Sequence, residues 1–313
     1  MEARRIAIPL LVCFGLTALV ACDRPTFDAA TPEGKRAIIE LTNKHLSAGN
    51  CAAAITEIEG LYKSASTDNE VRMIAASAYA CKANINFFKL VGQLVENSAF
   101  MGGNGFWALL AKLFPSTLDP NDRVVEGALL ATDALLANIK AGAVILPGNY
   151  INEGTYNPGA KVASDRLDNA NIYMLFVNMA TLGSLENRYG VPDPTTHLPT
   201  QALPWTTADH PNMPTQGCAF ASSLILLVDN LDVVVANLKG NLKEGLTTLK
   251  ASLQSSIYTA CDTICDAKGD DCPYCPIALR DRSQCTGELN DIPSEVAAAL
   301  TSLVNTGWTV PVP

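Results

Sequence analysis

The sequence predicts an all-α protein, and three observations support this fold class. Apolar residues recur at three- and four-residue steps over most of the chain, and strand patterns of period two are absent or short. Short polar breaks such as Ala48-Gly49-Asn50 separate the helical stretches. Of the 313 residues, 48% are hydrophobic and 17% are charged, which is too apolar for a disordered chain. We therefore expect helices packed around a buried core.

The charge balance excludes nucleic acid as a partner. Lys+Arg 22 against Asp+Glu 31 gives a formal net charge of −9, and no cluster of Lys and Arg is longer than two residues. A phosphate backbone needs a basic face, which this composition does not supply. Ten cysteines are more than a reduced cytosolic protein usually carries, and they favour an oxidising compartment.

The N-terminus has the pattern of a secretory signal, predicted over residues 1–21. Two arginines lie within the first five residues, and Ile6–Val20 is an apolar run too short to span a bilayer. The run ends in Leu19-Val20-Ala21-Cys22, which resembles the lipobox of bacterial lipoproteins. The resemblance implies cleavage between Ala21 and Cys22, acylation of Cys22, and a lipid anchor on the periplasmic side of the inner or outer membrane. The alternative is an ordinary signal peptide followed by a coincidental cysteine.

The mature chain is predicted to begin with a tether, residues 22–33, and to continue as one helical domain, residues 34–313. Helical patterns cover residues 34–48, 51–65, 70–82 and 86–96, and an offset of 34 aligns His45 with Tyr79 and Ala54 with Phe88. This period resembles tetratricopeptide repeats, which implies stacked helix pairs over residues 34–98. The family's Trp and Leu-Gly positions are missing, and Ser66 stands where its closing Pro should be. A plain helical bundle is the alternative.

Apolar helices are expected over residues 106–190, at 106–114, 122–146 and 165–189. Neither Val124–Leu146 nor Ala219–Leu238 is predicted to cross a membrane, because both carry charged residues. Residues 191–215 contain six prolines and are too long for a plain connection, so they are a candidate functional loop or cover.

The last part of the domain is predicted as a long helical hairpin over residues 216–264, followed by a Cys-rich loop and a terminal helix over residues 265–313. The hairpin turns at Gly240-Asn241. Each arm of the hairpin carries one leucine-rich apolar stripe. The stripe before the turn consists of Leu224, Leu227, Val228, Leu231, Val235 and Leu238. The stripe after the turn consists of Leu242, Leu246, Leu249, Leu253, Ile257 and Ile264.

Cleavage and acylation would leave eight cysteines for disulfides. Cys51 and Cys81 each lie fifteen residues from Ser66, so an antiparallel helix pair brings them together. Cys218 and Cys261 are nearly equidistant from Gly240 and are predicted to pair likewise, with Cys265 as a competitor one turn later. The sequence does not assign partners to four cysteines, namely Cys265, Cys272, Cys275 and Cys285.

One cysteine motif carries a possible chemistry. Cys272-Pro273-Tyr274-Cys275 resembles the active site of glutaredoxins, and Thr309-Val310-Pro311 resembles their cis-proline element. The resemblance implies a thiol–disulfide oxidoreductase that uses Cys272 and Cys275. The strand that precedes the motif in that family is replaced here by the polar residues 266–271, whose aspartates raise thiol pKa values. We therefore predict a structural role for this motif.

Other polar clusters are weaker candidates, and the sequence predicts no cofactor, no metal and no catalytic residue. The cysteine spacing fits neither a zinc nor an iron–sulfur site. Asp193, His197, Asp209 and His210 share the proline-rich loop and could meet at a cation, although solvated loop residues are the simpler interpretation. Asp229 and Asp232 could do acid–base work as a pair of carboxylates, but they are predicted to lie on a solvated face of their helix. Glu126 and Asp133 could line a partly polar cavity, with a satisfied core pair as the alternative.

These patterns together predict a membrane-anchored bacterial envelope lipoprotein with a non-catalytic binding or scaffolding role. Besides membrane lipid at Cys22, its partner would be a peptide, another protein or an apolar ligand, because stacked helix pairs leave a face for such partners. Two alternatives stay open, an oxidoreductase that uses Cys272 and Cys275, and a structural component of the envelope.

Overall fold

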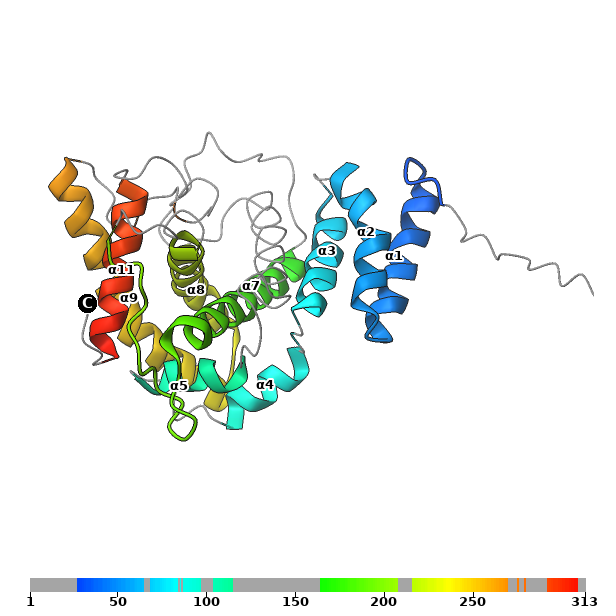
Figure 1. Cartoon of the computed structure of the whole chain (residues 1–313). Helices are drawn as coiled ribbons and strands as arrows, with labels where there is room; N and C mark the ends of the chain where they lie inside the picture. The colour runs from blue at the N-terminus through cyan, green and yellow to red at the C-terminus, as the bar shows by residue number, and fades with distance from the viewer. Residues whose placement is uncertain are drawn as a thin grey trace, which may run out of the picture.

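The computed structural model describes residues 27–64, 68–83, 85, 87–96, 104–114, 164–207, 216–269, 275, 279 and 292–308. These residues are mostly helical, and no strand occurs among them, which confirms the all-α fold class. The helices are α1 (Pro32–Ser47), α2 (Cys51–Ser64), α3 (Asn69–Lys82), α4 (Phe87–Glu96), α5 (Asn104–Leu113), α7 (Ser164–Leu185), the π-helical turn η3 (Glu186–Gly190), α8 (Cys218–Asn237), α9 (Gly240–Lys268) and α11 (Ile292–Gly307) (Figure 1).

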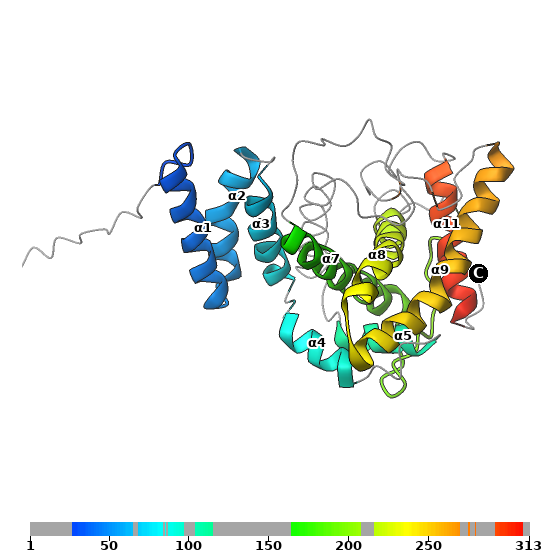
Figure 2. The same cartoon turned by 180° about the vertical axis from the view of Figure 1, so that it is seen from behind.

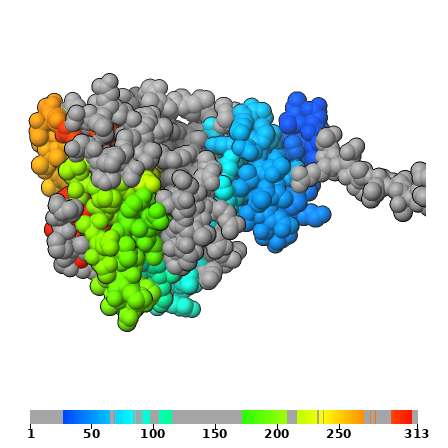
Figure 3. Space-filling view, in the orientation of Figure 1, coloured from blue at the N-terminus to red at the C-terminus, as the bar shows by residue number. Residues whose placement is uncertain are grey.

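Helices α1, α2 and α3 pack on one another at one end of the molecule, where Figure 3 shows them in blue and cyan. The first turns of α1 and α3 are capped by side chains: Thr31 accepts a hydrogen bond from Gly34 N at 3.0 Å, and Asp68 accepts from Glu70 N at 2.9 Å. Lys35 of α1 forms an ion pair with Asp68, which ties α1 to the start of α3. The observed bounds agree with the predicted helices to within about two residues.

The arrangement of α4 does not confirm the predicted tetratricopeptide-like pairing over residues 34–98. Such a repeat requires α3 and α4 to run side by side. Both views show α4 turning away from the end of α3, and α4 contacts α9 instead (Figures 1 and 2). The first three helices thus form a compact group, while α4 leads the chain toward the remaining helices.

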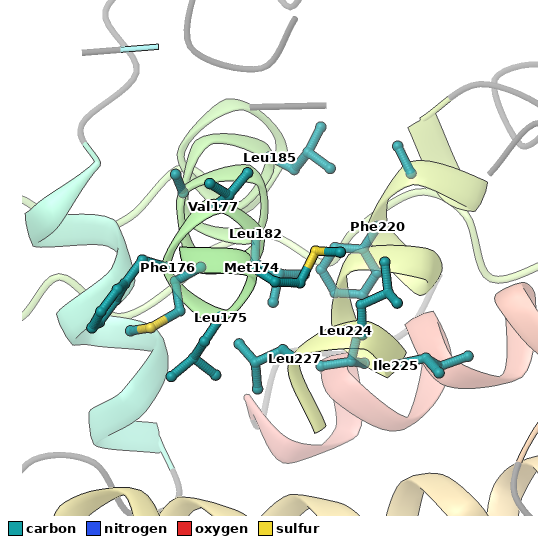
Figure 4. Packing of buried hydrophobic residues seen from close by; sticks show 14 of the residues in the cluster. Met174, Leu175, Phe176, Val177, Leu182, Leu185, Phe220, Leu224, Ile225 and Leu227 are labelled. Atoms are coloured by element: carbon teal, nitrogen blue, oxygen red, sulfur yellow. The ribbon is translucent and has the colours of Figure 1, made fainter. Parts of the chain in front are cut away.

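Helices α7 and α8 form the centre of the core. Every residue from Met174 to Glu186 is buried, as is every residue from Gly217 to Leu231. Figure 4 shows Met174 and Leu182 of α7 on the side that faces Phe220 of α8. Such helices, covered on all sides, are typical of a protein interior.

One described helix, α8, is long and apolar enough to cross a membrane by length and composition alone. Its residues Cys218–Ala236 are nearly all buried within the protein, against α7, α9 and α11. The core helix of a protein interior meets the same criterion, and the burial of α8 corresponds to that position.

Helix α9 leaves the end of α8 and packs mainly on α11. The stripe predicted on it is largely buried, including Leu242, Leu246 and Leu249. Gly240, at φ +68°, is the first residue of α9 and not the cap of α8. Figures 1 and 2 show α9 running obliquely away from α8, so the predicted hairpin opens beyond its turn.

Several predictions concern residues outside the part of the chain that the structure describes. These are the signal sequence at residues 1–21 with its cleavage site, the helix at residues 122–146 and part of the Cys-rich loop. The individual residues are Ala21, Cys22, Glu126, Asp133, Asp209, His210, Cys272 and Cys285.

Candidate functional site

The hairpin of α2 and α3 carries the disulfide that its register predicts. Cys51 at the start of α2 and Cys81 near the end of α3 are bonded, with their Cα atoms 5.3 Å apart. That separation lies within the usual range for a disulfide. The bond joins the open ends of the two helices, opposite the turn.

The predicted pairing of Cys218 with Cys261 is wrong. Cys261 is bonded to Cys275, with a Cα–Cα distance of 4.6 Å. Cys218 and Cys265 are each disulfide-bonded as well. Equal sequence distance from a turn brings two cysteines together only if the helices stay side by side, and α9 diverges from α8 toward α11.

The bond between Cys261 and Cys275 bears on the glutaredoxin-like motif. Cys275 is buried, and its partner lies 14 residues earlier in α9 and is not Cys272. An oxidoreductase of that type requires a bond that forms and breaks within its own CxxC. The observed pairing instead holds Cys275 against α9.

Asp229 lies in the interior, contrary to the solvated face that the sequence predicts for it. Its carboxylate is fully buried in α8 and accepts a hydrogen bond from the Tyr258 hydroxyl of α9 at 2.8 Å. The prediction failed because α8 is covered on all sides, so the face opposite its leucine stripe also meets protein.

The proline-rich loop is described over residues 191–207, which we call the cover. Asp193 closes a turn within it by accepting hydrogen bonds from Thr196 N at 2.7 Å and Thr195 N at 2.9 Å. These amide bonds hold the pKa of Asp193 below its ordinary value. No group of three potential metal ligands occurs among the described residues, so the proposed meeting of Asp193 and His197 with further ligands at a cation finds no support there.

The cover is attached to the body of the protein at two places. Near its middle, Thr200 N and Gln201 N donate to the carbonyl oxygen of Gly190 at 2.8 and 2.9 Å. Further along, the Asn305 side chain of α11 accepts from Leu203 N at 2.8 Å and donates to Leu203 O at 2.9 Å. Leu203 and Trp205 are fully buried as a result.

All three tryptophans of the chain, one of them in the cover itself, lie close together. Trp107 of α5 lies 5.3 Å from Trp308 and 6.2 Å from Phe220, measured between ring centroids. Trp205 of the cover lies 6.0 Å from Phe220 and 4.6 Å from Tyr189 of η3. These five side chains, Trp107, Trp205, Trp308, Phe220 and Tyr189, are called the tryptophan cluster below. Edge-to-face and offset contacts of this kind are favourable.

A close approach of α5 to α7 positions Trp107. A Cβ atom at Gly183 would lie 2.7 Å from the carbonyl oxygen of Leu110, so only glycine lets the two helices come this near. The Asn187 side chain then donates to Ala111 O at 2.9 Å and to Phe114 O at 3.1 Å. These bonds satisfy carbonyl groups at the end of α5 and fix that helix beside η3.

Glu186, the first residue of η3, borders the tryptophan cluster. A Cβ atom at Gly190 would lie 3.5 Å from Cγ of Glu186 and 3.4 Å from Cζ3 of Trp308, so both side chains lie beside this glycine. Glu186 is fully buried, and neither carboxyl oxygen has a hydrogen-bond partner among the described residues. Burial raises the pKa of Glu186 well above its ordinary value.

Further unsatisfied polar atoms accompany this carboxyl. Within the described part of the chain, the buried Nε1 atoms of Trp205 and Trp308 have no acceptor. Buried polar groups are nearly always hydrogen-bonded in folded proteins, so such exceptions need an explanation. Single π-helical turns inside helices often mark functional sites, and η3 carries Glu186 and Tyr189.

The residue that joins η3 to the cover is conformationally strained. Val191 has φ +43° and ψ 71°, a left-handed conformation that β-branched residues rarely adopt. Such strain costs about 1–3 kcal/mol and tends to occur at functional sites and switch regions.

The sequence analysis did not single out Glu186 or the tryptophans. One signal was present: Trp205 stands in a polar, proline-rich loop, and a large aromatic residue there indicates a loop that packs on the core. Glu186 directly follows Leu182-Gly183-Ser184-Leu185, but at the end of a predicted helix a glutamate is most simply solvated. Its burial follows from the position of the cover and of α11, which local patterns do not encode.

Comparison with known proteins gives no match to any protein-family model, curated protein or solved structure. The function must therefore be argued from the chain itself. The arrangement that most needs a functional explanation is Glu186 with the tryptophan cluster and its cover.

Proposed function

We propose that this chain is an exported lipoprotein, anchored to the periplasmic side of an envelope membrane through acylated Cys22. The basic and apolar leader and the Leu19-Val20-Ala21-Cys22 motif support the anchor. The disulfide-bonded cysteines support export, because such bonds persist in oxidising compartments. We keep the tetratricopeptide-like interpretation only for α1–α3, as a packed group of helices suited to contact a partner protein.

Metabolic labelling with a palmitate analogue tests the anchor. The wild-type protein should be labelled and the Cys22→Ser variant should not. Cys13→Ser is the matched control, because Cys13 lies in the leader and its loss leaves the acceptor intact. Equal labelling of wild type and Cys22→Ser would refute the anchor.

The proposed role of the folded part is the non-catalytic binding of an amphipathic ligand that carries a cationic group. The supporting observation is Glu186, whose carboxyl oxygens have no partner within the described chain although the side chain is fully buried. A cation would supply the partner that this carboxyl lacks. The faces of neighbouring indole rings also attract cations, by about 0.5–2 kcal/mol.

A purely structural role explains this site poorly. Leaving a buried donor or acceptor unsatisfied costs about 1–3 kcal/mol, and a charged group costs more. An apolar residue in place of Glu186 would remove that cost. Places where a chain departs from the rules for stability are often functional sites. The tryptophan cluster provides the apolar surroundings that the non-polar part of an amphiphile requires.

A titration of tryptophan fluorescence tests the ligand class. The probe is dodecyltrimethylammonium below its micellar concentration, with octyl glucoside and dodecyl sulfate as uncharged and anionic comparisons. Because all three tryptophans lie in the cluster, a ligand there should change the emission of the full-length protein. We expect saturable binding of the cationic probe, weakened about tenfold in Glu186→Gln, which corresponds to about 1.4 kcal/mol.

Glu295→Gln serves as the matched control for that titration. Glu295 is a glutamate of α11 that pairs with Lys268 at 2.7 Å, away from the cluster, and its replacement should leave the affinity unchanged. If wild type and Glu186→Gln bound the cationic probe equally well, Glu186 would not be part of a cation site.

A further inference from the structure

We propose that the cover is a proton-controlled lid: protonated Glu186 keeps residues 191–207 closed over the tryptophan cluster, and ionised Glu186 releases them. The inference concerns the site of the proposed function, but its test uses no ligand. Either proposal can therefore fail without the other.

The geometry places the carboxyl at the point where the lid is attached. Glu186 and Gly190 are the two ends of the single turn η3. The carbonyl of Gly190 accepts the hydrogen bonds of Thr200 N and Gln201 N, which hold the middle of the cover. A change in the charge of Glu186 thus acts on the turn to which the cover is bound.

The surroundings of Glu186 accept a neutral carboxyl and disfavour a carboxylate. Charged groups on the neighbouring elements are engaged elsewhere or exposed. In η3, Arg188 is exposed, and in α5, Lys112 is exposed. In α11, Glu295 pairs with Lys268. In α8, Asp229 accepts a hydrogen bond from Tyr258, and in η3 the Tyr189 hydroxyl donates to Gln216. In the cover, Asp193 accepts hydrogen bonds within its own turn, and the charge of His197 acts on Asp193.

An ionised Glu186 therefore has no counter-charge at hand in the described part of the chain. Burial is the cause of its shifted titration, and it raises the pKa of Glu186 well above the ordinary value of 4.5. In the closed state Glu186 keeps its proton to higher pH, whereas in an open state it would be in water and would lose the proton near pH 4.5. The stability of the closed state is complete below that pH and falls as the pH rises through the raised pKa.

The cover can open without unfolding the helices that it contacts. Val191, strained at φ +43°, lies at the junction between η3 and the cover, and release of the cover relaxes this conformation. The cover itself contains no helix or strand, only turns and the isolated Pro192–Pro199 bridge. Residues that absorb a conformational change commonly lie at such ends of helices.

Quenching of tryptophan fluorescence by acrylamide tests the lid. In full-length wild-type protein, the quenching constant should rise roughly threefold between about pH 5 and about pH 9, because the tryptophans become accessible as Glu186 ionises. In Glu186→Gln, which keeps the shape of the side chain but cannot ionise, the constant should stay low throughout. Glu295→Gln should follow the wild-type profile.

Hydrogen exchange provides a second readout that needs no variant. The amides of Thr200 and Gln201 should lose protection at high pH, after correction for intrinsic rates, while the amides of α7 stay protected. Quenching in the wild type that does not change with pH, or an unchanged pH dependence in Glu186→Gln, would overturn the proposal. Loss of protection in α7 together with the cover would also overturn it, since that is global unfolding.

Discussion

The α2–α3 hairpin and the region of η3 with its cover differ in how their helix ends are stabilised. In the hairpin, Asp68 caps α3 and pairs with Lys35, and Cys51 is bonded to Cys81. Around η3, the carboxyl of Glu186 lacks a partner among the described residues and Val191 is strained. The cap and the disulfide of the first region follow the ordinary rules of helix stability, whereas in the second region a carboxyl with both oxygens unsatisfied within the described part of the chain lies beside a strained backbone.

This difference separates stability from function within one chain. A region built only for stability tends to satisfy caps, charges and backbone conformation together. A region that must bind or switch retains groups whose energies are unfavourable in one state. Mutations should therefore lower stability in the hairpin, whereas some mutations near η3 should raise it.

The largest effect is expected from removing the disulfide of the hairpin. The double variant Cys51→Ser/Cys81→Ser should lose about 3–4 kcal/mol of unfolding free energy, because the bond closes a chain loop of 30 residues in the unfolded state. Urea unfolding followed by circular dichroism measures this loss. Tryptophan emission in native buffer should not change, because α1–α3 contain no tryptophan.

A change in the tryptophan emission of that variant would show that the hairpin and the region around η3 are one cooperative unit. That result would contradict the separation of the two regions. The single variant Cys13→Ser is a suitable control, since Cys13 lies in the predicted leader. It should unfold at the wild-type urea concentration.

The features that the sequence could predict lie mainly in α1–α3, and those that it could not predict lie mainly around α8, α9, α11 and η3. The caps and the cysteine spacing of α1–α3 act between residues close in the chain, so their helices and their disulfide were predictable. The burial of Asp229, the partner of Cys261 and the environment of Glu186 depend on how α8, α9 and α11 cross. Those crossings are set by packing between distant segments, which periodicity does not specify.

The next largest effect is expected from removing the Asn305 side chain, which binds the cover through Leu203. Asn305→Ala removes both hydrogen bonds to Leu203 and leaves that buried backbone without these partners, at a cost of about 2 kcal/mol. We expect acrylamide quenching to rise at every pH, since the cover is loosened independently of Glu186. Thr306→Ala on the exposed side of α11 is the control and should leave quenching unchanged. Unaltered quenching in Asn305→Ala would mean that the cover is held mainly by Trp205.

A smaller loss is expected at the cap of α3. Asp68→Ala removes the hydrogen bonds to Glu70 N and Val71 N and the pairing with Lys35, which should lower the unfolding free energy by about 1 kcal/mol. Asp68→Asn is the matched variant, because it keeps the cap and loses the charge. It should recover most of the loss, and thermal unfolding of both variants measures the difference.

The smallest effect has the opposite sign and is expected at Val191. Val191→Gly should raise the unfolding free energy by about 0.5–1 kcal/mol, because glycine adopts φ +43° without strain and the valine is 45% exposed. The gain is partly offset by the greater freedom of glycine in the unfolded chain. Val95→Gly is the matched control: Val95 is 41% exposed but lies in helix α4, so glycine should be mildly destabilising there. Thermal melts that move in opposite directions for the two variants would place conformational strain at the base of the cover. A lowered melting temperature for Val191→Gly would mean that the valine side chain contributes more than its conformation costs.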